Sequence, residues 1–115
     1  MESVLAGPAG VFALTPTERN LRRMTPTNFA PLGQSGPWDR IFAVAADLLW
    51  MSAPDGRLAA VDAKTGAVRF RSTVFIAQAD VSAIDPKSGD VAFVRGEEFH
   101  LLHADDGRDE VIRTR

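Results

Sequence analysis

The residues most able to carry chemistry in this chain are its two histidines, His100 and His103. If both lie on one strand, their odd separation points them to opposite faces of the sheet, so they could not jointly chelate a metal ion. The sequence therefore predicts two histidines at the surface or at a sheet edge, and it predicts no metal site.

A second candidate is an acidic run that invites a calcium interpretation: Asp85, Asp90, Asp105, Asp106, Asp109 and Glu110. The spacing of these carboxylates does not follow the twelve-residue ligand pattern of a calcium-binding loop. Aspartate and glycine are the ordinary residues of turns, and we interpret the run as turn chemistry. Asp62 is interpreted in the same way, as a residue that ends a strand and accepts hydrogen bonds from the following turn.

The aromatic and basic residues suggest a fold more than a ligand. Trp50 sits in an apolar segment and is expected in the core, whereas Trp38 follows a loop and could line a binding surface or plug a gap between repeats. The arginines that could form a basic stripe are Arg19, Arg22, Arg23, Arg40, Arg69 and Arg71. A solvated outer strand explains Arg69 and Arg71 without a nucleic-acid partner.

Composition narrows the class of protein but not its function. The 115 residues correspond to one domain, and a net charge of −2 suggests neither nucleic acid nor an anionic membrane as partner. The absence of cysteine excludes disulfides and thiolate metal sites. No phosphate loop, dinucleotide fingerprint, nucleophile elbow or cofactor site occurs, and no stretch approaches the roughly 20 apolar residues of a membrane span. Without a signal peptide, the cytoplasm is the expected compartment.

An internal repeat organises the chain. Leu5–Gly10 aligns with Met51–Gly56 at a spacing of 46, and Val11–Leu14 aligns with Leu58–Val61 at a spacing of 47. Phe99–Leu102 aligns with Leu58–Val61 at a spacing of 41. Because repeats define the architecture, each copy is expected to fold as the same small unit.

Within each copy the pattern favours short strands separated by turns. The middle copy predicts strands at Arg40–Ala46, Leu48–Ser52, Arg57–Asp62 and Ala67–Thr73. The last copy predicts strands at Asp80–Asp85, Val91–Arg95, Phe99–His103 and Glu110–Thr114. The fold class is therefore all-β, with antiparallel four-stranded units.

Two segments also fit helices. Ile41, Val44 and Leu48 fall at helical spacing within Arg40–Ser52, but the matching segment around Pro86 and Gly89 cannot be one helix, which favours two strands. Thr15–Glu18 has the form of a capping box, so a short helix within Pro16–Met24 stays open as an alternative.

The domain organisation that follows is a single unit over residues 1–115. It contains a partial copy at 3–25 that lacks its leading strand, a loop at 26–39, and full copies at 40–73 and 79–114. The loop holds several prolines and glycines without any period, as expected of an excursion between copies.

The segment Asp55–Phe70, with its Asp-Gly turn, its Val61-Asp62 strand end and its Thr65-Gly66 turn, resembles blades of pyrroloquinoline-quinone-like and WD-like β-propellers. In those blades a leucine usually stands at the position of Val61 and a tryptophan at the position of Phe70. The resemblance implies an incomplete propeller of about two and a half blades. It does not extend to the cofactor residues of the quinone-dependent dehydrogenases.

The number of copies shapes the expected function, because a propeller needs about four to eight blades. The chain is expected to be part of a larger propeller, to assemble with copies of itself into a ring, or to pack its sheets as a small sandwich. Its partners would then be a protein or further blades. A non-catalytic binding or scaffold module is the leading hypothesis, and a fragment of a propeller enzyme whose active site lies in missing blades is the alternative.

Overall fold

The computed structural model describes residues 3–15, 20–33, 37–45, 47–75 and 81–112, and these residues form three four-stranded antiparallel sheets. The first sheet contains β1 (Ser3–Gly7), β2 (Gly10–Leu14), β3 (Leu21–Met24) and β4 (Phe29–Pro31). The middle sheet contains β5 (Arg40–Val44), β6 (Leu48–Ser52), β7 (Arg57–Asp62) and β8 (Val68–Phe75). The last sheet contains β9 (Val81–Ile84), β10 (Val91–Arg95), β11 (Glu98–Leu102) and β12 (Asp109–Ile112).

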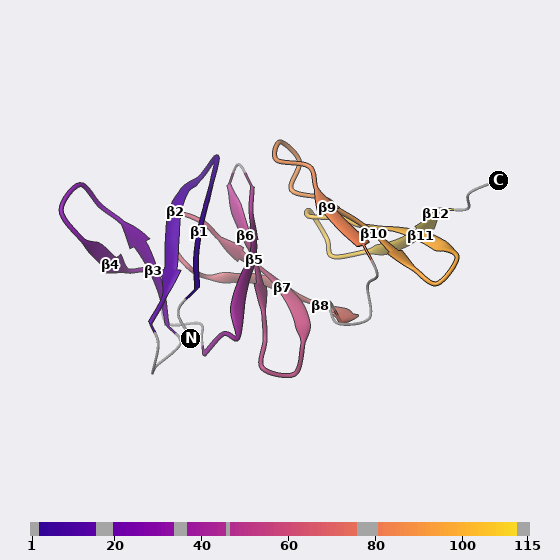
Figure 1. The fold of residues 1–115 in the computed structure, drawn as a ribbon, viewed down its shortest axis with the longest axis horizontal. Helices are drawn as coiled ribbons and strands as arrows, with labels where there is room; N and C mark the ends of the chain where they lie inside the picture. The colour runs from indigo at the N-terminus through magenta and orange to yellow at the C-terminus, as the bar shows by residue number, and fades with distance from the viewer. Residues whose placement is uncertain (1–2, 16–19, 34–36, 46, 76–80, 113–115) are drawn as a thin grey trace.

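Each sheet is a simple meander, since every strand pairs with its neighbour in sequence. The sheets follow one another along the 50 Å long axis of the molecule in the order first, middle and last (Figure 1). The all-β prediction is confirmed, and the strands predicted for the middle and last copies are present with ends that differ by a few residues.

The segment Arg40–Ser52 forms two strands, β5 and β6, rather than a helix. The helical spacing of its apolar residues has a different cause: a bulge between Ile41 and Ala43 interrupts the alternation of β5. As a result Ile41 and Val44 both belong to one core and Ala43 belongs to the other. In the second ambiguous segment Leu21–Met24 is strand β3, and residues 16–19 lie outside the described residues.

One boundary was predicted wrongly. The segment 26–39, expected as a loop, contains the three-residue strand β4, which pairs with β3 from Arg22 opposite Pro31 to Met24 opposite Phe29. The first sheet therefore has four strands, although its sequence match begins at the second strand of the repeat. Proline is tolerated here because β4 is the edge of its sheet.

The repeat has the same hairpin register in all three sheets. Leu5 pairs with Phe12, Met51 with Ala59, and Phe93 with His100, which are the pairs that the alignment of the copies requires. The hairpin forms the first two strands of the first sheet but the second and third strands of the other two sheets. The first sheet therefore begins at the second strand of the repeat, whereas the middle and last sheets begin at its first strand.

Two hydrophobic cores join the sheets and leave the middle sheet covered on both faces. The first core lies between the first and middle sheets and combines Phe12, Leu14, Leu21, Leu32, Trp38, Ile41, Val44, Leu49, Met51, Ala59, Val61 and Ala63. The second core lies between the middle and last sheets and combines Ala43, Ala45, Leu48, Trp50, Leu58, Ala60, Val74, Val91, Phe93, Leu102 and Ala104. Because side chains alternate along a strand, β6 and β7 supply both cores.

Candidate functional site

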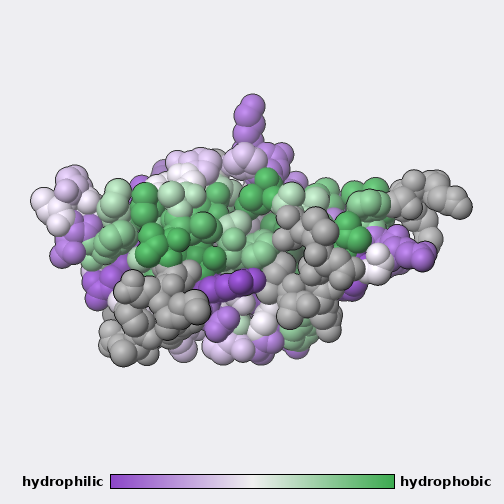
Figure 2. All heavy atoms as spheres, in the orientation of Figure 1, coloured by the Kyte–Doolittle hydropathy of each residue, from purple (hydrophilic) through white to green (hydrophobic). Residues whose placement is uncertain are grey.

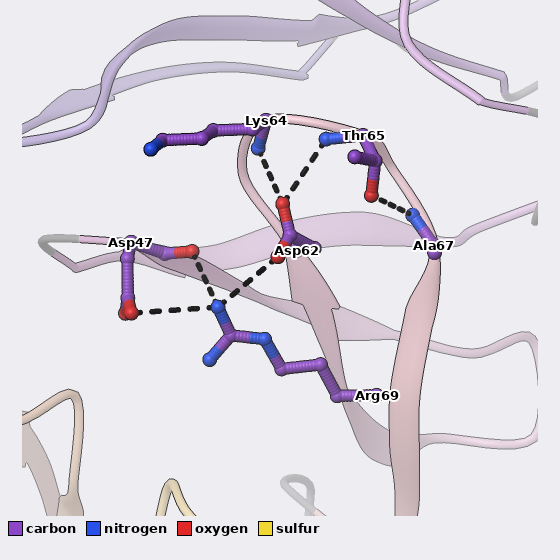
Figure 3. A network of polar contacts seen from close by, with 6 residues as sticks. All are labelled: Asp47, Asp62, Lys64, Thr65, Ala67 and Arg69. Carbon is purple, nitrogen blue, oxygen red and sulfur yellow. Dashed lines mark hydrogen bonds and ion pairs between the residues drawn. The ribbon is translucent and has the colours of Figure 1, made fainter.

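The most connected polar group of the middle sheet is the Asp62 turn, which joins β7 to β8 (Figure 3). The carboxylate of Asp62 accepts hydrogen bonds from the backbone N–H groups of Lys64 at 2.8 Å and Thr65 at 3.1 Å. Its second oxygen lies 3.2 Å from the guanidinium of Arg69, which also lies 3.4 Å from the carboxylate of Asp47. The interpretation of Asp62 as a strand end that binds the following turn is confirmed.

The electrostatics of this turn favour a charged Asp62. The hydrogen bond from the backbone of Lys64 is the largest influence that holds the pKa of Asp62 below its ordinary value, against partial desolvation; Thr65 and Arg69 act in the same direction. These partners of Asp62 all lie in the β7–β8 connection or in β8. The network therefore stabilises the β7–β8 connection.

The same turn recurs with different residues. Gly66, Gly89 and Gly107 each have positive φ and donate their N–H to the carbonyl four residues earlier, at distances from 2.7 to 2.9 Å. Backbone hydrogen bonds also hold the pKa of Asp85 and that of Asp106 below the ordinary value, led by the N–H of Lys87 and of Arg108 respectively. These two aspartates of the acidic run are turn residues.

The other acidic residues serve different contacts. Asp90 accepts a hydrogen bond from the N–H of Ala104 at 2.8 Å. Asp109 and Glu110 contact the two histidines. Among the described residues, no group of three or more histidine, aspartate or glutamate side chains is arranged to hold a metal ion.

His100 contradicts the prediction of a surface or edge histidine, since only 5% of it is exposed. Its ring stacks on Phe93 with centroids 4.8 Å apart. Nδ1 lies 2.8 Å from Asp109, and Nε2 lies 3.3 Å from Glu98. The burial follows from the register, because His100 pairs with Phe93 on the face that meets the middle sheet.

His103 follows β11 and contacts Glu110 at 2.8 Å and Arg108 at 3.2 Å. His100 therefore connects β11 to Asp109 of β12. His103, directly after β11, contacts Glu110 of β12 and Arg108 in the turn before it. Within the described residues around His100, the polar partners are the carboxylates of Asp109 and Glu98, and the contact with Asp109 holds β12 against β11.

The tryptophans and arginines divide among different faces. Trp50 is fully buried, as predicted, and Trp38 is buried in the first core. Arg23 lies over the ring of Phe12 and Arg71 over that of Trp38, whereas Arg69 belongs to the Asp62 turn. The possible basic stripe therefore does not form among the described arginines, and Arg19 lies outside the described residues.

The strongest candidate for a binding surface is the uncovered face of the last sheet. Directly paired residues share one face of a sheet, so the register places Val94, Phe99 and Ile112 in one row across three strands. The next row contains Ala83, Ala92 and Leu101, and it ends at Glu110 on β12. Phe99 and Ile112 are 47% and 44% exposed, so this face is largely apolar and open to solvent.

The uncovered face of the first sheet is largely apolar. Its residues include Val4, Ala6, Val11, Ala13, Met24 and Phe29, with Arg22 paired between Ala13 and Pro31. Val4 is 58% exposed and Met24 is 51% exposed. Figure 2 shows a side of the stack between these two end sheets, where hydrophobic residues gather in a band along the long axis. We call the two apolar faces the end faces.

The end faces were not among the residues singled out from the sequence. The signal was present, because Val91–Arg95 is apolar at consecutive positions, as in a strand buried on both faces. Which of its residues stay uncovered depends on how many sheets the stack contains, and no local pattern encodes that number.

Comparison with known proteins gives no family for this chain. No helix among the described residues is long and apolar enough to cross a membrane. The chain matches no family model and no curated protein.

Proposed function

We propose that this chain is a run of propeller-type repeats that acts as a non-catalytic binding or scaffold module, by adding further four-stranded sheets at its end faces. The observation that supports the proposal is the unequal covering of three similar sheets. The middle sheet has an apolar core on each side, whereas each outer sheet has a core on one side and a largely apolar face open to solvent on the other.

The last end face repeats the residues with which the middle sheet already binds a neighbour. In the shared hairpin register, Phe99 takes the place of Leu58 and Leu101 takes the place of Ala60. Leu58 and Ala60 both lie in the core that joins the middle sheet to the last sheet. The end face therefore has the composition of a surface that packs against another sheet.

Repeat arrays that end in solvent carry polar outer faces on their terminal repeats. Here the terminal faces carry exposed Val4, Met24, Phe99 and Ile112 instead. Contiguous exposed apolar patches mark interaction sites in soluble proteins. The partners proposed for the end faces are further blades, supplied by a longer form of the protein or by other copies of this chain.

The polar groups also favour binding over catalysis. The Asp62 turn and the contacts of His100 are used to hold strands and turns together. The resemblance of Asp55–Phe70 to propeller blades agrees with a scaffold role, since that architecture carries ligands at sites that several blades share.

Light scattering across a range of protein concentrations tests the proposal. The chain is expected to self-associate as concentration rises, because each additional contact removes an end face from water. Phe99→Glu places a charge in the last end face and is expected to shift the population to lower mass. The control Thr27→Glu adds the same charge on an exposed loop of the first sheet and is expected to leave the mass distribution unchanged.

The form of association separates the two sources of blades. A monodisperse trimer or tetramer indicates ring closure by copies, and open-ended association indicates that blades from a longer chain are needed. A strictly monomeric chain that also fails to bind a hydrophobic dye would contradict the proposal, because its end faces would then not behave as apolar surfaces.

A further inference from the structure

The pairing of β7 with β8 contains an irregularity beside two arginines. Arg57 pairs with Phe75, and Ala59 pairs with Arg71. These two pairs are two residues apart on β7 but four residues apart on β8, which indicates a bulge in β8. The hydroxyl of Ser72 donates to the carbonyl of Leu58 at 2.8 Å and accepts from the N–H of Val74 at 3.1 Å. Ser72 thus satisfies backbone groups that the bulge leaves unpaired. Bulges change the direction of neighbouring side chains and are frequent beside functional sites.

Both arginines are held against aromatic rings. The guanidinium carbon of Arg57 lies 5.0 Å from the centre of the Phe75 ring, and that of Arg71 lies 5.2 Å from the centre of the Trp38 ring. Trp38 is itself buried, which gives Arg71 a fixed support. A contact between a guanidinium group and an aromatic ring restrains the position of the cation, and the ring does not accept conventional hydrogen bonds from all of its N–H groups.

A small hollow lies between these two side chains. It has a volume of about 70 Å³ and is lined by Ala53, Asp55, Arg57, Leu58, Ala59 and Arg71. A water molecule takes about 30 Å³ in the liquid, so the hollow holds a group of a few heavy atoms. It is far smaller than the roughly 300–1,000 Å³ of a site for a drug-sized ligand.

The charge around the hollow is only partly neutralised. Asp55 is the one carboxylate among the lining residues, and its oxygen lies 3.7 Å from Nε of Arg57, with both side chains more than half exposed. In the part of the chain that the structure describes, Arg71 has its contact with Trp38 and no ion pair with a carboxylate. Two guanidinium groups therefore line a hollow of mixed polarity together with one carboxylate, which lies 3.7 Å from Nε of Arg57.

We propose that this hollow binds a single oxyanion group, either a carboxylate or a phosphate, through Arg57 and Arg71. Guanidinium groups present paired N–H donors that match the oxygens of both anions, and hydrogen bonds between charged groups are the stronger kind. Asp55 competes with the ligand for Arg57, so it weakens binding. The proposal is independent of the end faces and of the scaffold role.

Nuclear magnetic resonance of the arginine Nε–Hε groups tests the site directly. The intact chain is titrated at constant ionic strength with inorganic phosphate and, separately, with a blocked Gly-Glu-Gly peptide and its Gly-Gln-Gly counterpart. The Arg57 and Arg71 signals are expected to shift with phosphate or with the glutamate peptide, and not with the glutamine peptide. The phosphate and peptide arms separate a free anion from an acidic side chain of a protein partner.

Three variants and a control define the residues responsible. Arg57→Gln and Arg71→Gln are each expected to weaken binding about tenfold, the effect of losing a charge-assisted hydrogen bond. Asp55→Asn is expected to strengthen binding. Lys87→Gln removes a charge on the exposed β9–β10 turn of the last sheet, which does not line the hollow, and is expected to change nothing.

Arg71→Lys is a second variant for the case that Arg71→Gln disturbs the packing on Trp38, because it keeps the positive charge. It is expected to bind the anion more weakly than the original chain does. Equal weakening by Lys87→Gln would show that the anion binds the net charge of the surface, and it would overturn the site. Unchanged Arg57 and Arg71 signals in both titrations would also overturn the proposed site.

Discussion

At the scale of single residues, Gly66 is the position where the backbone leaves least freedom. It has a φ of 77° and is buried in the Asp62 turn. A Cβ at this position would collide with the carbonyl oxygen of Leu32 and lie 2.6 Å from its carbonyl carbon. The turn therefore packs directly against the chain segment that leads from the first sheet to the middle sheet.

Gly66→Ala is expected to lower the free energy of unfolding by about 2–5 kcal/mol. The positive φ accounts for about 1–3 kcal/mol and the collision with Leu32 accounts for a similar further amount. Gly96→Ala is the matched control, since Gly96 has a φ of 63° with nothing within 4 Å of the added Cβ. It should show the cost of φ alone. Urea denaturation measures both, and equal losses for the two variants would mean that the turn does not touch Leu32 in solution.

At the scale of elements, a specific hydrogen bond between described residues joins the middle and last sheets in addition to their apolar core. Nε1 of Trp50 on β6 donates to the carbonyl of Gly89 in the β9–β10 turn at 2.6 Å. The Trp50 ring also packs edge-on against Phe70, with centroids 5.7 Å apart. This bond fixes the last sheet at one position along the face of the middle sheet.

Trp50→Phe is expected to lower the free energy of unfolding by about 2–4 kcal/mol, because the buried carbonyl of Gly89 loses its donor and a small cavity opens. Met51→Leu, at the next residue of β6, points into the other core and conserves volume, so it should cost less than about 1.5 kcal/mol. Thermal and denaturant unfolding give both values. Similar losses for the two variants would argue against a specific bond between Trp50 and Gly89.

The strands also show which parts of the fold could be predicted from the sequence. Turn residues and apolar alternation are local, so the strands of the middle copy were predicted almost to their ends. Strand β4 could not be predicted in this way, because Phe29–Pro31 has no alternation of its own and becomes a strand through its pairing with β3. The bulge at Ile41–Ala43 imitates a helical period for the same reason: the sheet, and not the local sequence, determines it.

The candidate sites depended even more on tertiary structure. The burial of His100 follows from which face of β11 meets the middle sheet, and its partner Asp109 lies on another strand. Arg57 and Arg71 are 14 residues apart and line the same hollow beside the bulge between β7 and β8. Their sequence neighbourhood contains no motif that could have joined them.

At the scale of the whole molecule, stability should be graded from the centre of the stack to its ends. The middle sheet has both faces in a core, and all five residues of β6 are buried. By contrast, three of the four residues of β12 are exposed, and β4 has three residues at a sheet edge. Segments with few buried contacts open locally at lower free energy than segments in the core.

Hydrogen exchange is expected to follow this order. The amides of β6 and β7 should exchange slowest, and those of β4 and β12 should exchange fastest, with a difference of several powers of ten. The amides of β10 and β11 should fall between them, because one face of the last sheet is uncovered. Slow exchange in β12 would contradict this order and would indicate that another molecule covers the last sheet in solution.

The meander connectivity gives the molecule a mechanical character. Every strand pairs with a strand next to it in sequence, and each sheet contains its own backbone pairs. A force that pulls the two ends apart would therefore separate the strands of each sheet in sequence order, one strand pair after another. Between the sheets it would meet the two cores and the bond from Trp50 to Gly89. Such a chain would lengthen in steps, and each step would release one sheet while the others stay folded.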